Sequence, residues 1–396
     1  MLRISATCLG YGLALALVLP MAGAQAHDTL KVLYNFAGGP DTDNPSSGLI
    51  ADKSGNYYGT GLYGGGGCGV GCGTVYELAP DGTETILHTF SGAGDGTFPF
   101  GALLADGAGN FYATTTDGGA DNRGTIYKIA AGGAETVLYS FTGGSDGSSP
   151  HGAFIADKKG NMYSTALYGG VEGCASGCGT IFELAANGSV STLYAFKGGA
   201  EGANPYSTLL SDKSGNLYGT TFDAGNAGCT GNAGCGTVFR LAPDGTLTTL
   251  YAFKGGSGDG GNPRSSLIAD KAGNFYGTTT LGGASGCGTV FKLAPNGTET
   301  LLYSFSGGSS CSGPLSALVA DRKGNFYGTT LKDGADGKGT VFRLAPDGTA
   351  KVLHDFTGGA DGGNPYGALL LQGKTLVSTT YAGGTHGVGT VFELKE

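Results

Sequence analysis

The chain has 396 residues, of which 81 are glycine, 40% are hydrophobic and 13% are charged, and its formal net charge is −9. Glycine far exceeds its usual share of roughly 7%, yet the apolar and aromatic content excludes a disordered polymer, and glycine lacks the every-third-residue period of collagen. The balance of 22 Lys and Arg against 31 Asp and Glu, with no basic run, argues against nucleic acid as a partner.

The first 26 residues have the features of a secretory signal peptide. A basic start at Arg3 is followed by an apolar stretch over residues 13–18 and by the small-x-small ending at residues 24–26, so we expect cleavage before His27. A membrane anchor is the alternative, but Pro20 interrupts the apolar stretch, which is shorter than the ~20 residues of a spanning helix. We therefore predict a protein secreted to the periplasm or the medium, with no membrane span in the mature chain.

Residues 27–396 repeat one unit of ~52 residues seven times, which leaves no room for a second domain. The clearest mark, Gly-Thr followed by Val or Ile and an aromatic residue, begins at Gly73, Gly124, Gly179, Gly236, Gly288, Gly339 and Gly389. A second mark, Asp-x-x-Gly-Asn-x-Tyr, begins at Asp52, Asp106, Asp157, Asp212, Asp270 and Asp321. A third mark, Tyr or His followed by x-Phe, begins at Tyr34, His88, Tyr139, Tyr194, Tyr251, Tyr303 and His354.

Each unit contains four short β-like runs, named A to D, which in the fifth unit are residues 263–270, 274–279, 288–293 and 298–305. Asp-x-x-Gly-Asn between A and B, and Pro-Asp-Gly or Pro-Asn-Gly between C and D, are typical of tight hairpin turns. Four strands per unit in seven units predict an all-β fold, a seven-bladed β-propeller with four-stranded blades. An open solenoid is the alternative, but it would need atypical capping repeats at both ends.

The two ends of the repeat region are complementary. The region opens with a D-type run at residues 30–36 and ends with a C-type run at residues 390–394. We expect these two runs to pair, because the pairing closes the ring and removes two exposed sheet edges.

The linked series in residues 251–297, which contains Leu-Tyr-x-Phe, Asp-x-x-Gly-Asn-x-Tyr-Gly-Thr-Thr and Gly-x-Gly-Thr-Val-Phe-x-Leu-x-Pro-x-Gly, resembles the repeat of the bacterial GloVer tandem-repeat family. The resemblance extends over residues 30–394. It implies a secreted or surface-displayed bacterial protein, and it brings no established activity with it.

Removal of the signal peptide leaves eight of the nine cysteines, an even number in an oxidising compartment, so we expect disulfides. Spacing suggests the pairs Cys68 with Cys72, Cys174 with Cys178, Cys229 with Cys235 and, by exclusion, Cys287 with Cys311. A zinc site is the alternative, but it would need clusters of cysteines that lie here in different repeats.

The candidate binding residues are positions at which the seven units differ. In a four-stranded meander the AB and CD turns lie on one face of the disc, and the longer BC and DA loops lie on the other, where binding residues concentrate. The residue after the proline of run A varies among units and should ring the mouth of a central channel on the long-loop face. A second variable position follows the Gly-Thr-Thr of run B. From these two positions we select Phe100, His151, Tyr206, Arg264, Tyr366, Tyr63, Tyr168 and Tyr381 as candidate ligand-binding residues.

Aromatic residues beside Asp, Arg and His suit a surface on which a sugar or a peptide stacks. Drift at exposed positions that packing does not constrain is the alternative explanation for their variability. Among cofactors only Ca²⁺ needs consideration, because the DA loops carry acidic residues. Asp41 with Asp43 is the one dense cluster, and turn chemistry accounts for the remaining acids.

The sequence therefore predicts a secreted, monomeric, non-enzymatic binding module that recognises a glycan, a peptide or a cell-envelope component. One alternative is a propeller hydrolase or lyase that uses His151, Arg264 and Tyr206 at the channel mouth. Against it, His151 has no nucleophile or carboxylate partner that spacing identifies, and acid–base catalysis requires such a partner. A structural surface protein is the other alternative.

Overall fold

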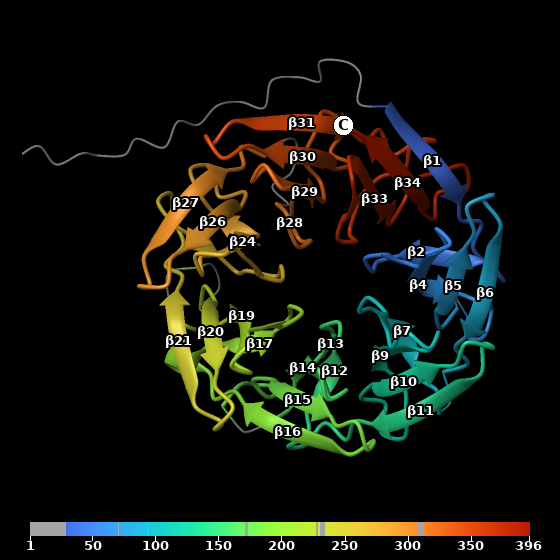
Figure 1. Cartoon of the computed structure of the whole chain (residues 1–396), viewed down its shortest axis with the longest axis horizontal. Coiled ribbons are helices and arrows are strands. Elements are labelled where there is room, and N and C mark those ends of the chain that lie inside the picture. Colours follow the sequence, from blue (N-terminus) through green and yellow to red (C-terminus); the bar gives the residue numbers. More distant parts are fainter. Residues whose placement is uncertain are drawn as a thin grey trace, which may run out of the picture.

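The computed structural model describes residues 29–69, 71–92, 94–170, 173–226, 229, 234–307 and 313–396. The predicted signal peptide at residues 1–26 and Cys311 lie outside these residues. Seven blades of antiparallel strands stand around a central axis (Figure 1), which is the predicted seven-bladed propeller; the strands of blade V are divided between two sheets. The only helix in the described ranges is the short 3-10 turn η1 (Gly199–Glu201), and none there is long and apolar enough to cross a membrane.

The strands follow one another from the axis to the rim in each blade. Blade I contains β2 (Thr42–Pro45), β3 (Ile50–Ala51), β4 (Tyr57–Gly64), β5 (Thr74–Leu78) and β6 (Glu84–Thr89). Blade II contains β7 (Thr97–Pro99), β8 (Leu104–Ala105), β9 (Phe111–Asp117), β10 (Thr125–Ile129) and β11 (Glu135–Ser140). Blade III contains β12 (Ser148–Pro150), β13 (Ile155–Ala156), β14 (Met162–Tyr168), β15 (Thr180–Leu184) and β16 (Val190–Ala195). Blade IV contains β17 (Ala203–Pro205), β18 (Leu210–Ser211), β19 (Leu217–Asp223), β20 (Thr237–Leu241) and β21 (Leu247–Ala252).

The remaining three blades follow the same order. Blade V contains β22 (Gly260–Gly261), β23 (Ile268–Ala269), β24 (Phe275–Thr279), β25 (Leu281–Gly282), β26 (Thr289–Leu293) and β27 (Glu299–Ser304). Blade VI contains β28 (Val319–Ala320), β29 (Phe326–Thr330), β30 (Thr340–Leu344) and β31 (Ala350–Asp355). Blade VII contains β32 (Leu370–Gln372), β33 (Thr375–Thr380), β34 (Thr390–Lys395) and, as its outer strand, β1 (Thr29–Asn35).

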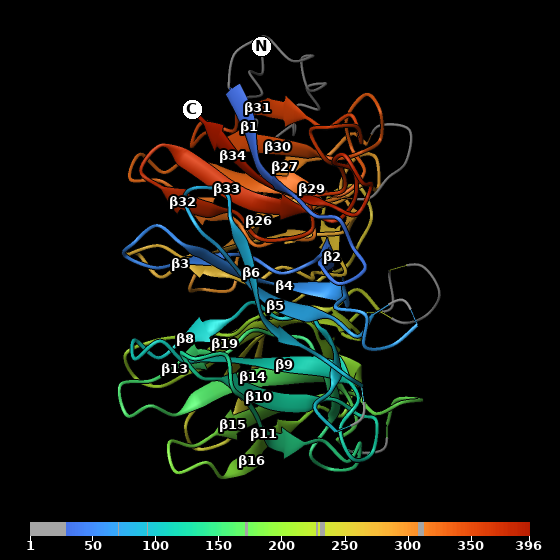
Figure 2. The ribbon, with the colours of Figure 1, turned by 90° about the vertical axis from the view of Figure 1, so that its right-hand side faces the viewer.

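The ring closes through the pairing predicted from the sequence. β1 pairs antiparallel with β34, from Thr29 opposite Lys395 to Asn35 opposite Thr390. The sheet order β1-β34-β33-β32 therefore joins the two ends of the chain in one blade, as Figure 1 shows. Figure 2 shows the hairpins that contain β3, β8 and β13 on one side of the disc and longer loops on the other.

The innermost strand of most blades is split into two short segments, so four of the blades have five strands rather than the expected four. Small residues fill the interruption, since neighbouring blades crowd one another beside the axis. A Cβ on Gly367 would lie 2.5 Å from the carbonyl oxygen of Ser47 in the adjacent blade. The Thr379 hydroxyl donates to that same carbonyl at 3.3 Å.

Edge-to-face aromatic pairs form the core between blades, and they explain two of the repeated marks. The phenylalanine that ends each D run packs on the aromatic residue of the Gly-Thr mark in the following blade. Ring centroids lie 5.0–5.2 Å apart at interplanar angles of 67–72°. The pairs are Phe36 with Tyr76, Phe90 with Tyr127, Phe141 with Phe182, Phe196 with Phe239, Phe253 with Phe291, Phe305 with Phe342 and Phe356 with Phe392. All seven blade interfaces thus use one contact.

Candidate functional site

A residue in the left-handed backbone conformation precedes the proline of strand A. It directs the side chain that follows the proline toward the axis. In four blades this residue is an asparagine whose side-chain amide donates to a carbonyl of the preceding blade. The bonds are Asn44 to Tyr381, Asn204 to Leu167, Asn262 to Phe222 and Asn364 to Leu331, at 2.7–3.0 Å. The proline lies against the glycine of the preceding blade's Gly-Thr mark, where no side chain fits. Each blade therefore presents its variable residue from a fixed backbone.

The variable residues of four blades meet at the axis. The Phe100 ring centroid lies 4.8 Å from that of His151, 5.9 Å from that of Tyr206 and 5.5 Å from that of Tyr366. His151 and Tyr206 lie 4.7 Å apart. All four side chains are partly exposed. Phe100 of blade II contacts residues of blades IV and VII, so these side chains meet across the axis, where the sequence predicts that they ring the mouth of a central channel.

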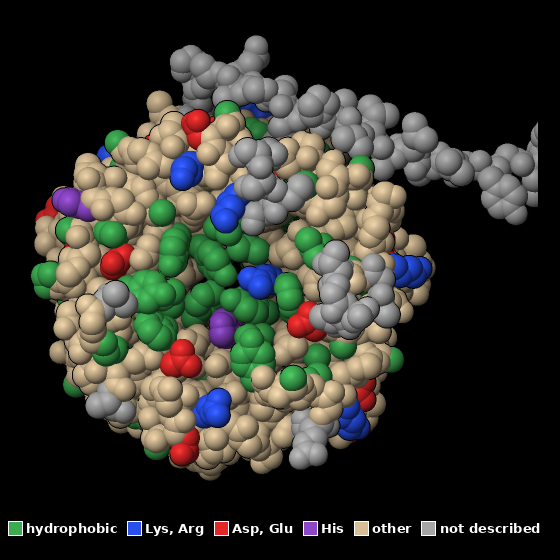
Figure 3. Space-filling model, turned by 180° about the vertical axis from the view of Figure 1, so that it is seen from behind, with side chains coloured by type: hydrophobic (Ala, Val, Ile, Leu, Met, Phe, Trp, Pro, Cys, Tyr) green, Lys and Arg blue, Asp and Glu red, His purple; other side chains and the backbone are tan. Residues whose placement is uncertain are grey.

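Arg264 joins this cluster from blade V. Its guanidinium carbon lies 4.9 Å from the Tyr206 ring centroid and 4.6 Å from the Phe222 ring centroid, a cation–π arrangement with two rings. We name Phe100, His151, Tyr206, Arg264 and Tyr366 the axial patch. Figure 3 shows hydrophobic side chains gathered at the centre of one face, together with a histidine and a basic side chain.

The other three predicted residues extend the axial patch outward. Tyr381 lies 6.4 Å from Tyr366, between ring centroids, and Tyr63 is close enough to raise the pKa of Tyr381, after burial, which is the larger cause. Burial, then Tyr366 and to a smaller extent Tyr168, raise the pKa of Tyr206, which places Tyr168 near Tyr206. Tyr168 is 39% exposed, the one exposed large hydrophobic residue in the part of the chain that the structure describes. The structure therefore brings all eight candidates to one region.

The strand register places Tyr381 differently from the sequence grouping. Thr380 pairs with Thr390 in blade VII as Gly61 pairs with Thr74 in blade I, so Tyr381 corresponds to Leu62 and not to Tyr63. Tyr381 is thus equivalent to Phe222 of blade IV, which follows Thr221 opposite Thr237. This explains why Tyr381 lies beside the axial patch as Phe222 does.

Sequence reasoning missed Phe222 and Phe98. The Phe98 ring lies 5.4 Å from that of Tyr63. Phe98 has φ +59° at the place where four other blades have asparagine, and a bulky residue rarely adopts that conformation. The asparagine-to-phenylalanine difference between units was the signal available in the sequence. Backbone strain of this kind concentrates at functional sites.

His151 is neutral at pH 7. Burial among the rings, reinforced by the charge of Arg264, lowers the pKa of His151 to about 4 despite a hydrogen bond to a backbone carbonyl. That bond joins Nδ1 to the Ser149 oxygen at 2.8 Å. Nδ1 therefore carries the proton, and Nε2 is free of a proton and can accept a hydrogen bond. No carboxylate of the described chain pairs with the His151 ring, so the geometry offers a hydrogen-bonding and stacking surface rather than an acid–base pair.

The predicted Ca²⁺ ligands do not form a cation cage. Asp41 accepts hydrogen bonds from the backbone N–H groups of Ala37 at 2.7 Å and Thr42 at 2.6 Å, which makes it a loop cap. Burial raises the pKa of Asp43, and its Oδ1 is buried without a partner. Among the described residues no three His, Cys, Asp or Glu side chains are grouped to hold a metal ion. The Ca²⁺ hypothesis gains no support from this geometry.

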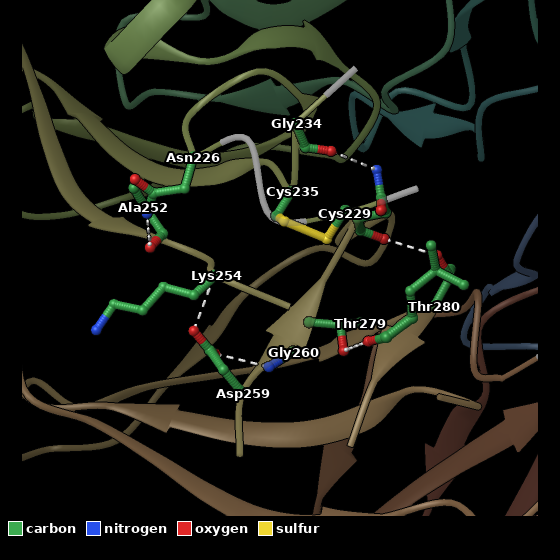
Figure 4. Close-up of a disulfide and its surroundings, with 12 residues drawn as sticks. Asn226, Cys229, Gly234, Cys235, Ala252, Lys254, Asp259, Gly260, Thr279 and Thr280 are labelled. Carbon is green, nitrogen blue, oxygen red and sulfur yellow. Dashed lines mark hydrogen bonds between the residues drawn. A yellow bond between two sulfur atoms is a disulfide. The ribbon is translucent and has the colours of Figure 1, made fainter. Parts of the chain in front are cut away.

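Three predicted disulfides are present, Cys68 to Cys72, Cys174 to Cys178 and Cys229 to Cys235. Cys287 is also disulfide-bonded, and Cys311, its predicted partner, lies outside the described residues. Figure 4 shows the Cys229 to Cys235 bridge above the loop that contains Lys254 and Asp259. A Cβ on Gly261 of β22 in blade V would lie 2.6 Å from the Cys229 sulfur. The bridge therefore packs closely against the inner strand of the next blade.

Comparison with solved structures reveals likeness of fold. The extracellular domain of a protein assigned as a one-component system from B. thetaiotaomicron matches with TM-score 0.56 and 11% identity, over 90% of this chain and 39% of its own, so this chain spans about two fifths of it. Puromycin hydrolase matches with TM-score 0.55 and 13% identity, over 85% of this chain and 50% of its own. A protein assigned as a 6-phosphogluconolactonase from Bacteroides uniformis matches with TM-score 0.51 and 16% identity, over 80% of this chain and 86% of its own. Identities this low show likeness of fold alone.

No curated protein shows significant sequence similarity to this chain. The sequence model of the Gloeobacter/Verrucomicrobia repeat matches residues 21–175 and 153–392, nearly the whole chain. The linked marks around residues 251–297 had suggested the same family. The chain therefore belongs to the Gloeobacter/Verrucomicrobia repeat family.

Proposed function

We propose that this protein is a secreted, non-enzymatic binding module that recognises a glycan through the axial patch. The observation that supports the proposal is the convergence of different side chains from one strand position. Phe100, His151, Tyr206 and Tyr366 approach within 4.7–5.9 Å, although the rest of each unit repeats. Partly exposed rings offer apolar faces to the C–H groups of a sugar, and the Tyr hydroxyls and His151 Nε2 offer hydrogen bonds to its hydroxyl groups.

Packing alone would not require this diversity. Ser46 stands at the same position in blade I and is buried, so a small residue also satisfies the fold there. Phe98, in a strained conformation beside Tyr63, adds a further ring at a cost to stability. A position that drifted without selection would more readily hold the unstrained asparagine of the other blades.

Secretion of a chain of residues 27–396, as one propeller after a signal peptide of residues 1–26, belongs to the same proposal. The three disulfides of the described chain support it, because such bonds persist in oxidising compartments. A monomer is the simplest assembly, because ring closure leaves no unpaired edge between β1 and β34.

A ligand panel tests the proposal. The melting temperature of the purified protein is measured against neutral and acidic oligosaccharides, cell-wall fragments and short peptides. A ligand at 100 times its dissociation constant adds about 2.7 kcal/mol to the free energy of unfolding. Binding of a sugar that Tyr366→Ala weakens at least tenfold, and that Tyr112→Ala leaves unchanged, would support the axial patch. Tyr112 is a suitable control, since its ring lies under Lys128 in blade II, outside the patch.

Three results would contradict the proposal. If no ligand of the panel raises the melting temperature, the structural surface protein is favoured. If only peptides bind, a glycan ligand is excluded. Turnover of a bound ligand that His151→Ala abolishes, with affinity retained, would favour the hydrolase or lyase instead.

A further inference from the structure

Arg264 differs from the other members of the axial patch in its chemistry. Of the residues that follow the strand-A proline in the seven blades, it is the only one with a permanent charge. Its guanidinium carbon lies over both the Tyr206 and the Phe222 ring, at 4.9 Å and 4.6 Å from their centroids. Contact with two aromatic faces restrains the guanidinium plane before any ligand arrives.

The Arg264 guanidinium forms no ion pair in the described chain. No carboxylate there lies within 4.0 Å of its guanidinium, and its Nε is buried without a hydrogen-bond partner. Arg343, by contrast, forms an ion pair with Glu396. Asp223 is close enough for Arg264 to lower its pKa, but burial is the larger effect and raises the pKa of Asp223 overall. A buried, unpaired donor on a cation is costly unless a ligand satisfies it.

We infer that Arg264 makes the axial patch selective for glycans that carry a carboxylate, such as a uronic acid residue. This inference rests on the proposed function and names its ligand class. The guanidinium would receive the carboxylate through two parallel N–H···O bonds, a geometry that lysine cannot supply. The rings of Tyr206, Tyr366 and Phe100 would hold the sugar ring beside it, which favours an acidic sugar over an acidic peptide.

The neighbouring histidine fits an anionic ligand without competing for it. His151 is uncharged at neutral pH, because burial lowers its pKa to about 4. The positive charge at the centre of the patch is therefore that of Arg264. Arginine keeps its charge at all accessible pH values, so carboxylate binding should weaken with salt.

The test uses an oligogalacturonate and its methyl ester, which differ only in the charge of the carboxyl group. Affinities of the purified protein are compared with those of Arg264→Gln, Arg264→Lys and Arg240→Gln by calorimetry. Arg240 is the matched control, because its Nε is also buried without a partner but it lies on β20 beside Thr248. The inference predicts tighter binding of the acid than of the ester, and a loss of about 10- to 100-fold for the acid alone in Arg264→Gln.

Arg264→Lys should recover little of that loss, since lysine lacks the planar pair of donors. Melting temperatures show whether each variant is folded, and unchanged affinity for a neutral sugar shows that the rings are intact. Equal binding of acid and ester, or equal loss of both in Arg264→Gln, would overturn the inference and leave the glycan proposal standing. Binding of an acidic peptide in preference to the acid would also overturn it. Absence of binding to every sugar would refute the proposed function itself.

Discussion

The side-chain amide of Asn262 donates a 2.8 Å hydrogen bond to the carbonyl oxygen of Phe222 in the preceding blade. Asn262 has φ +54°, a conformation that asparagine tolerates better than other side chains. One residue thus supplies the backbone turn before Pro263 and a bond between two blades. Phe98 occupies the equivalent place at φ +59° and has no such amide.

Phe98→Asn should therefore stabilise the protein by about 1 kcal/mol, because it relieves backbone strain and restores a donor toward blade I. If Phe98 contributes a ring to the axial patch, the same variant should bind the sugar more weakly. Chemical denaturation and calorimetry measure the two effects. A stabilised variant with unchanged affinity would remove Phe98 from the site, and a destabilised one would show that its contact with Tyr63 outweighs the strain.

A second prediction compares alanine substitutions at two glycines, Gly236 of the Gly-Thr mark and Gly245. Gly236 and Gly245 have φ +80° and +85°, so alanine is strained at both. A Cβ on Gly236 would collide with the Thr221 carbonyl and lie 2.7 Å from Pro263 Cδ, whereas a Cβ on Gly245 would meet nothing within 4 Å. Gly245→Ala should cost about 1 kcal/mol and Gly236→Ala at least 3 kcal/mol. Equal costs, measured by urea denaturation, would show that contact between blades is not what requires this glycine.

The aspartate of the second mark has a structural role in the six blades that contain it. The carboxylate of Asp270 accepts hydrogen bonds from the N–H groups of Ala272 and Asn274, both at 2.9 Å, from the Asn274 amide at 2.7 Å and from the Tyr276 hydroxyl at 3.0 Å. Burial raises the pKa of Asp270, but these bonds together outweigh it and lower the pKa below 3.8. The predicted tight turn is present as an Asx turn, and its hydrogen bonds account for the Asp, Asn and Tyr of the mark.

Asp270→Ala should cost about 1–2 kcal/mol at pH 7. Because the carboxyl group has a lower pKa in the folded protein than in the unfolded chain, its contribution is present above pH 3.8 and disappears as the pH falls through the folded value. Unfolding free energies of both proteins should therefore converge in acid. Asp244→Ala is the control and should cost less, since the Asp244 carboxylate bonds to one other residue, Thr246, whereas that of Asp270 bonds to three. A difference for Asp270→Ala that persists at pH 2 would contradict this account.

Glu84 predicts the opposite pH dependence. Its carboxyl oxygens accept hydrogen bonds from the hydroxyls of Thr42 at 2.9 Å and Tyr34 at 3.2 Å. Burial, and then the adjacent Asp41, raise the pKa of Glu84 from 4.5 to about 8. A raised pKa stabilises the folded protein fully below pH 4.5, and the stabilisation is lost as the pH rises toward 8.

Glu84→Gln imitates the protonated carboxyl group and should remove this loss. Relative to the unmodified protein, the variant should gain on the order of 1–2 kcal/mol between pH 5 and pH 9. Thermal unfolding at both pH values measures the gain. Parallel pH profiles would mean that Glu84 is ionised throughout in the folded state.

His151 adds a third pH effect. Its pKa is about 4 in the folded protein against 6.5 in the unfolded chain, so protonation opposes folding and stability is lost as the pH falls from 6.5 to 4. His151→Phe, which introduces the residue that Phe100 presents in blade II, should abolish this loss, on the order of 2 kcal/mol. Unfolding free energies at pH 7 and pH 4.5 measure it. The same decline in both proteins would place the acid sensitivity elsewhere.

Sequence alone determined the architecture of this protein, because the fold is a local unit used seven times. Turn marks such as Asp270 to Tyr276 are completed by residues at most six positions apart, and hydrogen bonds of that range can be predicted from order alone. The pairing of β1 with β34 followed from counting the runs. The Cys68 to Cys72 bridge and its counterparts followed from spacing, since their partners are near neighbours.

The candidate site was only half determined. Comparison of the units selected Phe100, His151, Tyr206 and Tyr366 and placed them around the mouth of a central channel, but it did not determine whether they touch one another. The tertiary structure brought them together across the axis, because seven inner strands converge so closely that long side chains from blades II, IV and VII meet. The contact of Arg264 in blade V with Tyr206 and Phe222 in blade IV depends likewise on the distance between these two blades. The spacing of residues along the chain does not encode that distance.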